Sequence, residues 1–122
     1  MAKEIRVKKM SSFLQEEISE IIHNNLRDEN IKGVVSVFDV ELSKDLRYAT
    51  VKLSVMVNSE NELKNTVKAL IRAKSFVRRK LSKTLKTAYA PELYFEFIDL
   101  SRSMKVYEIL KGIERHGEND RY

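Results

Sequence analysis

The sequence has no cysteine, one proline and three glycines among its 122 residues. Without cysteine, disulfide frameworks, thiolate nucleophiles and cysteine-ligated zinc sites are excluded, which fits a reducing compartment. The glycines are Gly33, Gly112 and Gly117, so neither a GxGxxG fingerprint nor a phosphate-binding P-loop can be written.

Long hydrophobic runs are also missing. No stretch of about 18 apolar residues could span a membrane, and the first ten residues, MAKEIRVKKM, lack the apolar core of a signal peptide. We therefore expect a cytoplasmic protein that does not associate with membranes. The length of 122 residues and the apolar fraction of 43% suffice for one globular domain with a single core.

Catalytic and metal-binding patterns are absent as well. Neither of the two histidines, His23 and His116, is part of a motif with metal-ligand spacing. Asp39, Glu41 and Asp45 lie close together in the sequence, but no nucleophile or base accompanies them. We expect no catalytic residue, no metal, no cofactor and no small-molecule substrate, and hence a protein that is not an enzyme.

Hydrophobic spacing predicts a helix followed by a β-hairpin. Apolar residues recur three and four positions apart from about residue 4 to residue 28, which is typical of an amphipathic helix. Residues 34–42 and 48–57 are rich in valine and flank the polar stretch SKDLR, so they predict two paired strands. The first strand does not alternate cleanly, which indicates a β-bulge. In the second strand, the face that we expect to be buried carries Ala49, Val51, Leu53, Val55 and Val57.

The second half of the chain predicts a helical region, a strand and a last helix. Ser59 and Glu62 have the spacing of a capping box, and helical spacing follows from Leu63 to about residue 88. Pro91 favours an extended chain before the alternating stretch ELYFEFI. Residues 106–113 predict a last helix, and RHGENDRY predicts a frayed polar end.

This order favours an α+β fold in which helices pack on one face of a small mixed sheet of three strands. It is also the element order of a type II KH domain, α-β-β-α-(kink)-α-β, with a C-terminal extension. We assign residues 1–100 to a KH-like domain and residues 101–122 to a C-terminal helical extension with a polar tail.

The net charge of +5 comes from one segment. Residues 63–91 contain nine basic and no acidic residues, whereas residues 1–62 contain nine basic and eleven acidic residues and residues 92–122 contain five and seven. On a helical wheel, five cations of this segment lie opposite its apolar stripe, along about 27 Å of helix. An ordinary solvated face mixes both signs of charge, so we favour contact with nucleic acid over simple solvation. The five cations are Lys68, Arg72, Arg79, Lys83 and Lys86.

Two residues of the basic segment are on the wrong side of that wheel. Lys74 falls on the apolar stripe and Phe76 falls near the cations, so one continuous helix would bury an ammonium and expose a phenyl ring. We predict a break near residues 73–75 and two helices that meet at Ser75, which returns Phe76 to the core and Lys74 to water. The alternative is that Lys74 extends its ammonium to solvent from an unbroken helix with a half-exposed Phe76.

The sequence resembles the ribosome-binding factor A family over nearly its whole length. The resemblance is carried by RVKKM, VVSVFDVELSKDLRYATVKLSV, AKSFVRRKLSKTL, APELYFEFIDLS and VYEILKGI. It implies a type II KH-like fold and a cold-shock-associated protein, not an enzyme, that acts in maturation of the small (30S) ribosomal subunit and processing of its rRNA. The family's interhelical kink has the form Ala-x-Gly, which here corresponds to Ala73, Lys74 and Ser75, with serine in the place of the glycine.

The predicted partner is the small ribosomal subunit with its rRNA, bound by a monomer through basic contacts. Two alternatives remain: a protein-interaction adaptor that uses the open face of the hairpin, or a KH-like module that binds nucleic acid without specificity. The predicted RNA-binding residues are Lys68, Arg72, Lys74, Ser75, Arg78, Arg79, Lys83, Lys86, Arg6, Lys8 and Lys9.

Overall fold

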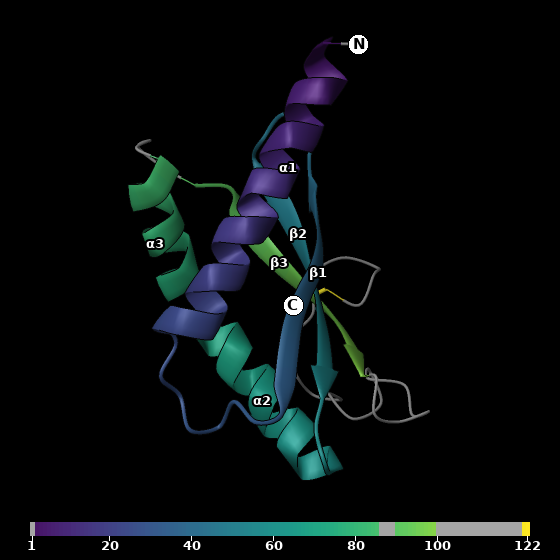
Figure 1. Ribbon diagram of the computed structural model, residues 1–122, viewed down its shortest axis with the longest axis vertical. Helices are drawn as coiled ribbons and strands as arrows, with labels where there is room; N and C mark the ends of the chain where they lie inside the picture. The colour runs from purple at the N-terminus through teal and green to yellow at the C-terminus, as the bar shows by residue number, and fades with distance from the viewer. Residues whose placement is uncertain (1, 86–89, 100–120) are drawn as a thin grey trace.

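A computed structural model describes residues 2–85, 90–99 and 121–122 (Figure 1). The first helical segment ends at Asn25 and not near residue 28, because its last turn is a π-helical turn after which Leu26 is already extended. The elements are α1 (Ala2–Glu20), η1 (Ile21–Asn25), β1 (Val34–Leu42), β2 (Tyr48–Met56), α2 (Glu60–Arg72), α3 (Lys74–Leu85) and β3 (Glu92–Asp99).

The strands form one mixed sheet in the order β1-β2-β3. β1 and β2 are antiparallel neighbours joined by a short turn, whereas β2 and β3 are parallel, because the chain crosses over through α2 and α3 between them. Figure 1 shows the helices gathered on one side of this sheet. The predicted α+β class and element order are therefore confirmed.

The core lies between the helices and one face of the sheet. The predicted alternation in β2 is confirmed, since Ala49, Val51, Leu53 and Val55 are fully buried. Leu93 and Phe95 extend the buried face into β3. The helices complete the core with Leu14, Ile18, Leu63, Val67, Leu70, Val77 and Leu81, all buried.

A β-bulge interrupts β1, as its irregular pattern predicts. The pairing register shifts between Val37 and Asp39, and Phe38 is the extra residue, 44% exposed. Val37 and Val40 are an odd number of positions apart, yet both are buried. An alternating strand can bury both only if one residue is inserted between them.

Gly33, which precedes β1, has a backbone conformation that favours glycine. Its φ is +66°, and a Cβ atom at this position would collide with the main-chain oxygen of Met56. The segment before β1 can approach the end of β2 this closely only because Gly33 has no side chain.

The predicted C-terminal helix over residues 106–113 and the predicted domain boundary after residue 100 lie outside the described residues. The prediction of a frayed polar end is wrong for Arg121 and Tyr122. The N–H of Tyr122 donates to the Phe95 oxygen at 2.7 Å. The residue is 2% exposed, and the centre of its ring lies 5.9 Å from that of Phe97. Burial of the aromatic ring against β3 is more favourable in free energy than its exposure to water.

Candidate nucleic-acid interface

The basic segment folds as two helices that break at Ala73. α2 ends at Arg72 and α3 begins at Lys74, and the two helices follow different directions (Figure 1). Ala73 keeps a right-handed conformation, and its N–H donates to the oxygens of Ala69 and Leu70 at 3.0 and 3.1 Å. The predicted break near residues 73–75 is confirmed, but the two helices meet at Ala73 and not at Ser75, which is already part of α3.

Ser75 fits the junction without strain. Among the described residues, the only non-glycine residue with a positive φ is Leu46, so the junction does not use the backbone region that favours glycine. Serine in the place of the family's glycine therefore leaves the bend intact, and its side chain is exposed.

Phe76 packs against the core, half-buried, and the ammonium of Lys80 lies 6.0 Å from its ring centre. The prediction that Lys74 returns to water is wrong. Lys74 is half-buried, and its Nζ donates to the main-chain oxygen of Tyr122 at 2.7 Å. Burial lowers the pKa of Lys74, and the negative charge of Glu92 partly opposes that effect. The acceptor is 48 positions away in the sequence, so no local pattern could reveal it.

Arg78 also makes an internal contact. Its Nε and Nη2 donate to the main-chain oxygen of Ala90 at 3.2 and 3.0 Å. This two-pronged contact fixes α3 to the residues that lead into β3. Of the predicted RNA-binding residues, Lys74 and Arg78 therefore also make contacts inside the protein, although Arg78 itself remains exposed.

The outer side of the helix pair carries the remaining cations. Arg72, Arg79 and Lys83 are exposed, and Lys68 is partly exposed. Arg72 lies 3.6 Å from a carboxylate oxygen of Asp28, a surface pair of small energetic value. The pKa of Asp28 is lowered first by the Asn30 N–H and to a smaller extent by Arg72. Lys86 lies outside the described residues.

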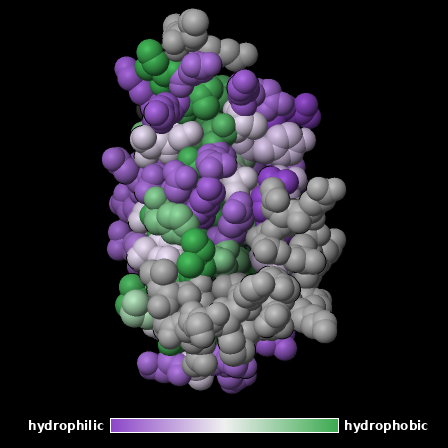
Figure 2. Space-filling model, turned by 90° about the vertical axis from the view of Figure 1, so that its right-hand side faces the viewer, coloured by the Kyte–Doolittle hydropathy of each residue, from purple (hydrophilic) through white to green (hydrophobic). Residues whose placement is uncertain are grey.

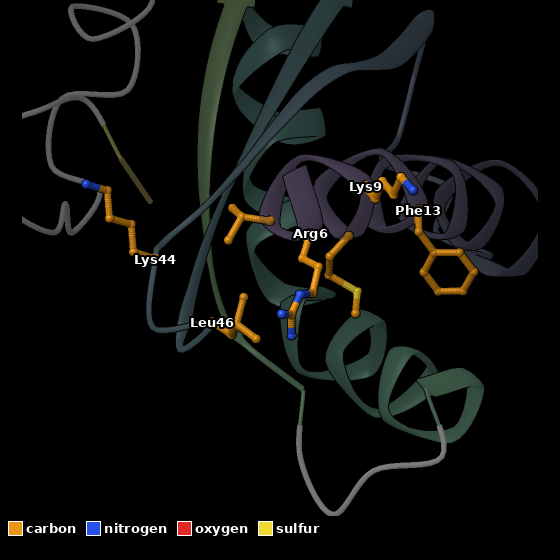
Figure 3. A pocket seen from close by; sticks show the side chains of 7 residues that line it. Arg6, Lys9, Phe13, Lys44 and Leu46 are labelled. Atoms are coloured by element: carbon orange, nitrogen blue, oxygen red, sulfur yellow. The ribbon is translucent and has the colours of Figure 1, made fainter. Parts of the chain in front are cut away.

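The three predicted residues of α1 lie on two sides of that helix. Arg6 and Lys9 line an apolar groove beside the turn between β1 and β2, which Figure 3 shows from close by. Lys8 lines a second groove, together with acidic residues of α1 and β1. The analysis of the sequence missed Lys44, which lines both grooves from the turn.

Neither a metal site nor a membrane segment occurs in the described part of the chain. No group of three or more histidine, cysteine, aspartate or glutamate residues there could hold a metal ion. No helix within those residues has the length and apolarity that crossing a membrane requires. The Nε2 atom of His23 lies 2.6 Å from the main-chain oxygen of Val35 in β1, and its Nδ1 atom lies 3.3 Å from the hydroxyl of Ser19.

The fold defines the class of protein: a KH-like α+β domain whose helix pair carries a stretch without acids. Residues 6–110 match the sequence model of the family described as ribosome-binding factor A. The chain belongs to this family.

Individual relatives agree with that assignment. Ribosome-binding factor A of Dictyoglomus thermophilum is 37% identical over 116 residues, which is 94% of this chain and 96% of the relative. The protein of the same name from Halothermothrix orenii is 37% identical over 117 residues, 95% of this chain and 94% of the relative.

Solved structures show the same fold. A solution structure of a putative ribosome binding factor A from Thermotoga maritima is 32% identical, with a TM-score of 0.59 over 82% of this chain and 91% of its own. A Thermus thermophilus ribosome binding factor A, fitted as a homology model into a cryo-EM map of its 30S complex, is 26% identical. Its TM-score is 0.54 over 72% of this chain and 88% of its own.

Proposed function

We propose that this protein binds the free small ribosomal subunit through its rRNA and serves maturation of that subunit and processing of its rRNA. The observation that carries the proposal is the helix pair: residues 63–85 hold no acid, and the structure exposes Arg72, Arg79 and Lys83 on it. The Thermus thermophilus relative fitted into the 30S complex supports the choice of partner.

The chemistry of these cations fits phosphates better than bases. Lysine and arginine contact phosphate oxygens through charge and hydrogen bonds, and such contacts carry affinity without reading sequence. Selectivity then comes from the shape of the folded rRNA against the bent helix pair. The internal contacts of Lys74 and Arg78 fix α3 to Tyr122 and Ala90, while Arg6, Lys8 and Lys9 add phosphate contacts from α1. The protein acts as a monomer and needs no small-molecule substrate.

Charge reversal tests this proposal. The triple variant Arg72→Glu, Arg79→Glu, Lys83→Glu should bind purified small subunits far more weakly than the unaltered protein in a sedimentation assay. If about five phosphates are neutralised, log affinity of the unaltered protein falls with log salt at a slope of about −3.5 to −4.5. In the variant, the magnitude of this slope should fall by about 2 to 3, since each of the three lost phosphate contacts contributes about 0.7 to 0.9.

The matched control reverses three exposed cations outside α2 and α3: Arg27→Glu, Lys32→Glu and Arg47→Glu. It changes the net charge equally and should retain most of the binding. Unchanged association and salt dependence in the Arg72, Arg79 and Lys83 variant would overturn the mechanism. Equal affinity of the protein for duplex DNA would indicate a non-specific binder, and its absence from all ribosomal fractions of a cell extract would indicate an adaptor.

A further inference from the structure

A groove lies between the N-terminal half of α1 and the turn that joins β1 to β2 (Figure 3). Its volume is about 750 Å³, and its apolar lining consists of Val7, Met10, Phe13 and Leu46. Among the residues that the structure describes, its charged lining consists of three cations, Arg6, Lys9 and Lys44, and includes no carboxylate. The groove therefore combines an apolar floor with charge of one sign.

The apolar lining is exposed to solvent. Met10 is 37% exposed, Phe13 39% and Leu46 47%. Figure 2 shows hydrophobic surface among hydrophilic atoms at the end of the molecule that carries the start of α1. Several large apolar side chains that converge on one groove, and not singly scattered, are typical of a binding surface.

Leu46 sits in the groove at a cost in backbone energy. Its φ is +64°, a left-handed conformation that glycine and asparagine adopt at a lower energetic cost than leucine. Hydrogen bonds hold this turn: the Leu46 N–H donates to the Ser43 oxygen at 2.9 Å, and the Ser43 hydroxyl donates to Asp45 at 2.7 Å. The geometry of the turn does not explain a leucine at this position. We therefore attribute the leucine to its exposed side chain, which lines the groove.

The second groove, on the other side of α1, provides an internal contrast. It is lined by Lys8 and Lys44 but also by Glu4, Asp39 and Glu41. A polyanion would meet carboxylates there, whereas the charged residues described in the lining of the first groove are all cations. Charge therefore favours the first groove for an anionic partner.

We propose that the first groove binds unpaired nucleotides of an RNA strand, with bases against Met10, Phe13 and Leu46 and phosphates against the cations Arg6, Lys9 and Lys44. The inference rests on the proposed function, because it takes RNA as the partner, and it adds a single-strand site to the helix pair. A nucleotide strand alternates flat apolar rings with anions, and this lining alternates apolar side chains with cations.

The dimensions agree with a short stretch of strand. Arg6 and Phe13 are seven residues apart on α1, about 10 Å at 1.5 Å per residue, which is the length of about three stacked nucleotides. The apolar lining of the groove offers few hydrogen-bonding groups to the edges of bases. We therefore expect stacking without a preference for any particular base. An acidic amphipathic protein segment is the competing occupant, and the experiment below separates the two.

The test compares two RNA strands of equal charge. The full-length protein is titrated with a fluorescent oligoadenylate of eight nucleotides and with an abasic strand of the same length. We expect the abasic strand to bind about tenfold more weakly, with the same salt dependence, because it keeps all its phosphates. Equal affinity of the two strands would overturn the inference.

Two variants localise the effect. The double variant Phe13→Gln, Leu46→Asn should remove the preference for the strand with bases, because it takes away the aromatic ring on which a base stacks, and asparagine suits the left-handed backbone at position 46. The matched control Phe38→Gln alters a phenylalanine of β1 that is 44% exposed, against 39% for Phe13, and should keep the preference. Preference retained by the double variant would also overturn the inference. So would tight binding of an acidic amphipathic peptide that these RNA strands do not displace.

Failure of this inference differs from failure of the proposed function. If the groove has no role, the strand preference is missing while the variant of Arg72, Arg79 and Lys83 still loses small-subunit binding. If the proposed function is wrong, that helix-pair variant binds small subunits like the unaltered protein, whatever the two strands show.

Discussion

The open face of the sheet and the outer side of the helix pair use positive charge in opposite ways. On the sheet, the Lys52 ammonium donates to Glu41 at 2.6 Å and lies 3.8 Å from Asp39. The guanidinium of Arg121 lies 4.9 Å from the ring centre of Tyr94 on the same face. On the helix pair, residues 63–85 supply no carboxylate at all, and Arg79 and Lys83 are exposed.

The difference shows that the number of cations on a surface does not measure its capacity to bind a polyanion. Cations of the sheet already interact with carboxylates and aromatic rings of the protein, so an approaching phosphate would have to compete with those contacts. Lys74 and Arg78 show that the helix pair also uses part of its charge internally. What remains for a partner is the exposed subset. The predictions below test the contrast between the two regions, from the largest expected effect to the smallest.

The largest effect should come from removing the apolar support of the helix pair. Leu81 on α3 is fully buried, so Leu81→Ala should lower the free energy of unfolding by about 2–5 kcal/mol. Ile98, 46% exposed on the open face of the sheet, is the matched control, and Ile98→Ala should cost less than about 1 kcal/mol. Urea unfolding followed by circular dichroism measures both, and equal losses would show that the open face is covered as well as the helix face.

A smaller effect is expected at the junction of the helix pair. Ser75→Gly should lower the free energy of unfolding by about 0.5 kcal/mol, because the backbone there is ordinary helix and glycine is a poorer helix former than serine. Ser75→Ala should be neutral or slightly stabilising. Thermal unfolding of the two variants decides the matter, and a gain in stability with glycine would mean that the junction needs a backbone freedom the structure does not show.

The smallest effect concerns the titration of two lysines and is spectroscopic. The hydrogen bond to Glu41 raises the pKa of Lys52 above its usual 10.5, and burial lowers the pKa of Lys74 below 10.5. Lys52 therefore stabilises the fold below pH 10.5 and loses that contribution as the pH rises through its raised pKa. Lys74 opposes folding while charged, and that cost disappears between its lowered pKa and pH 10.5.

Carbon NMR of the lysine Cε atoms measures these pKa values directly. As the pH rises, Lys74 should lose its proton at a lower pH than Lys52. Glu41→Gln should bring the pKa of Lys52 back toward 10.5 and leave Lys74 unchanged, which provides the control. Titration of both lysines at the same pH would contradict the contrast between the two regions.

Local patterns predicted most of the fold. The alternation in β2, the bulge in β1 and the helix cap at Ser59 follow from periodicities or spacings over a few residues, and the structure contains all three. At the cap, the Ser59 hydroxyl accepts from the Glu62 N–H, whereas the Glu62 carboxylate accepts from the N–H of Asn58 and not from that of Ser59. The misplaced Lys74 and Phe76 predicted the break between α2 and α3, which the structure contains. Of the two expected consequences, Phe76 does pack against the core, whereas Lys74 does not return to water.

The candidate site was predictable only in part. The concentration of cations in residues 63–91 is visible in the sequence, but the roles of Lys74 and Arg78 are not, because their acceptors belong to Tyr122 and Ala90. The groove was also missed. Its walls come from α1 and from the turn after β1, and Leu46 is unremarkable until its backbone conformation and exposure are known.

The sequence by itself determined which segments are helix and strand, which faces are apolar and where the charge is concentrated, since these follow from the order of neighbouring residues. Only the tertiary structure decided which cations remain exposed to a partner. That outcome depends on distances between residues far apart in the chain, such as the 2.7 Å from the ammonium of Lys74 to Tyr122. A charged group next to such a partner is desolvated and occupied, whereas the same group on the outer side of α3 is available to an approaching phosphate.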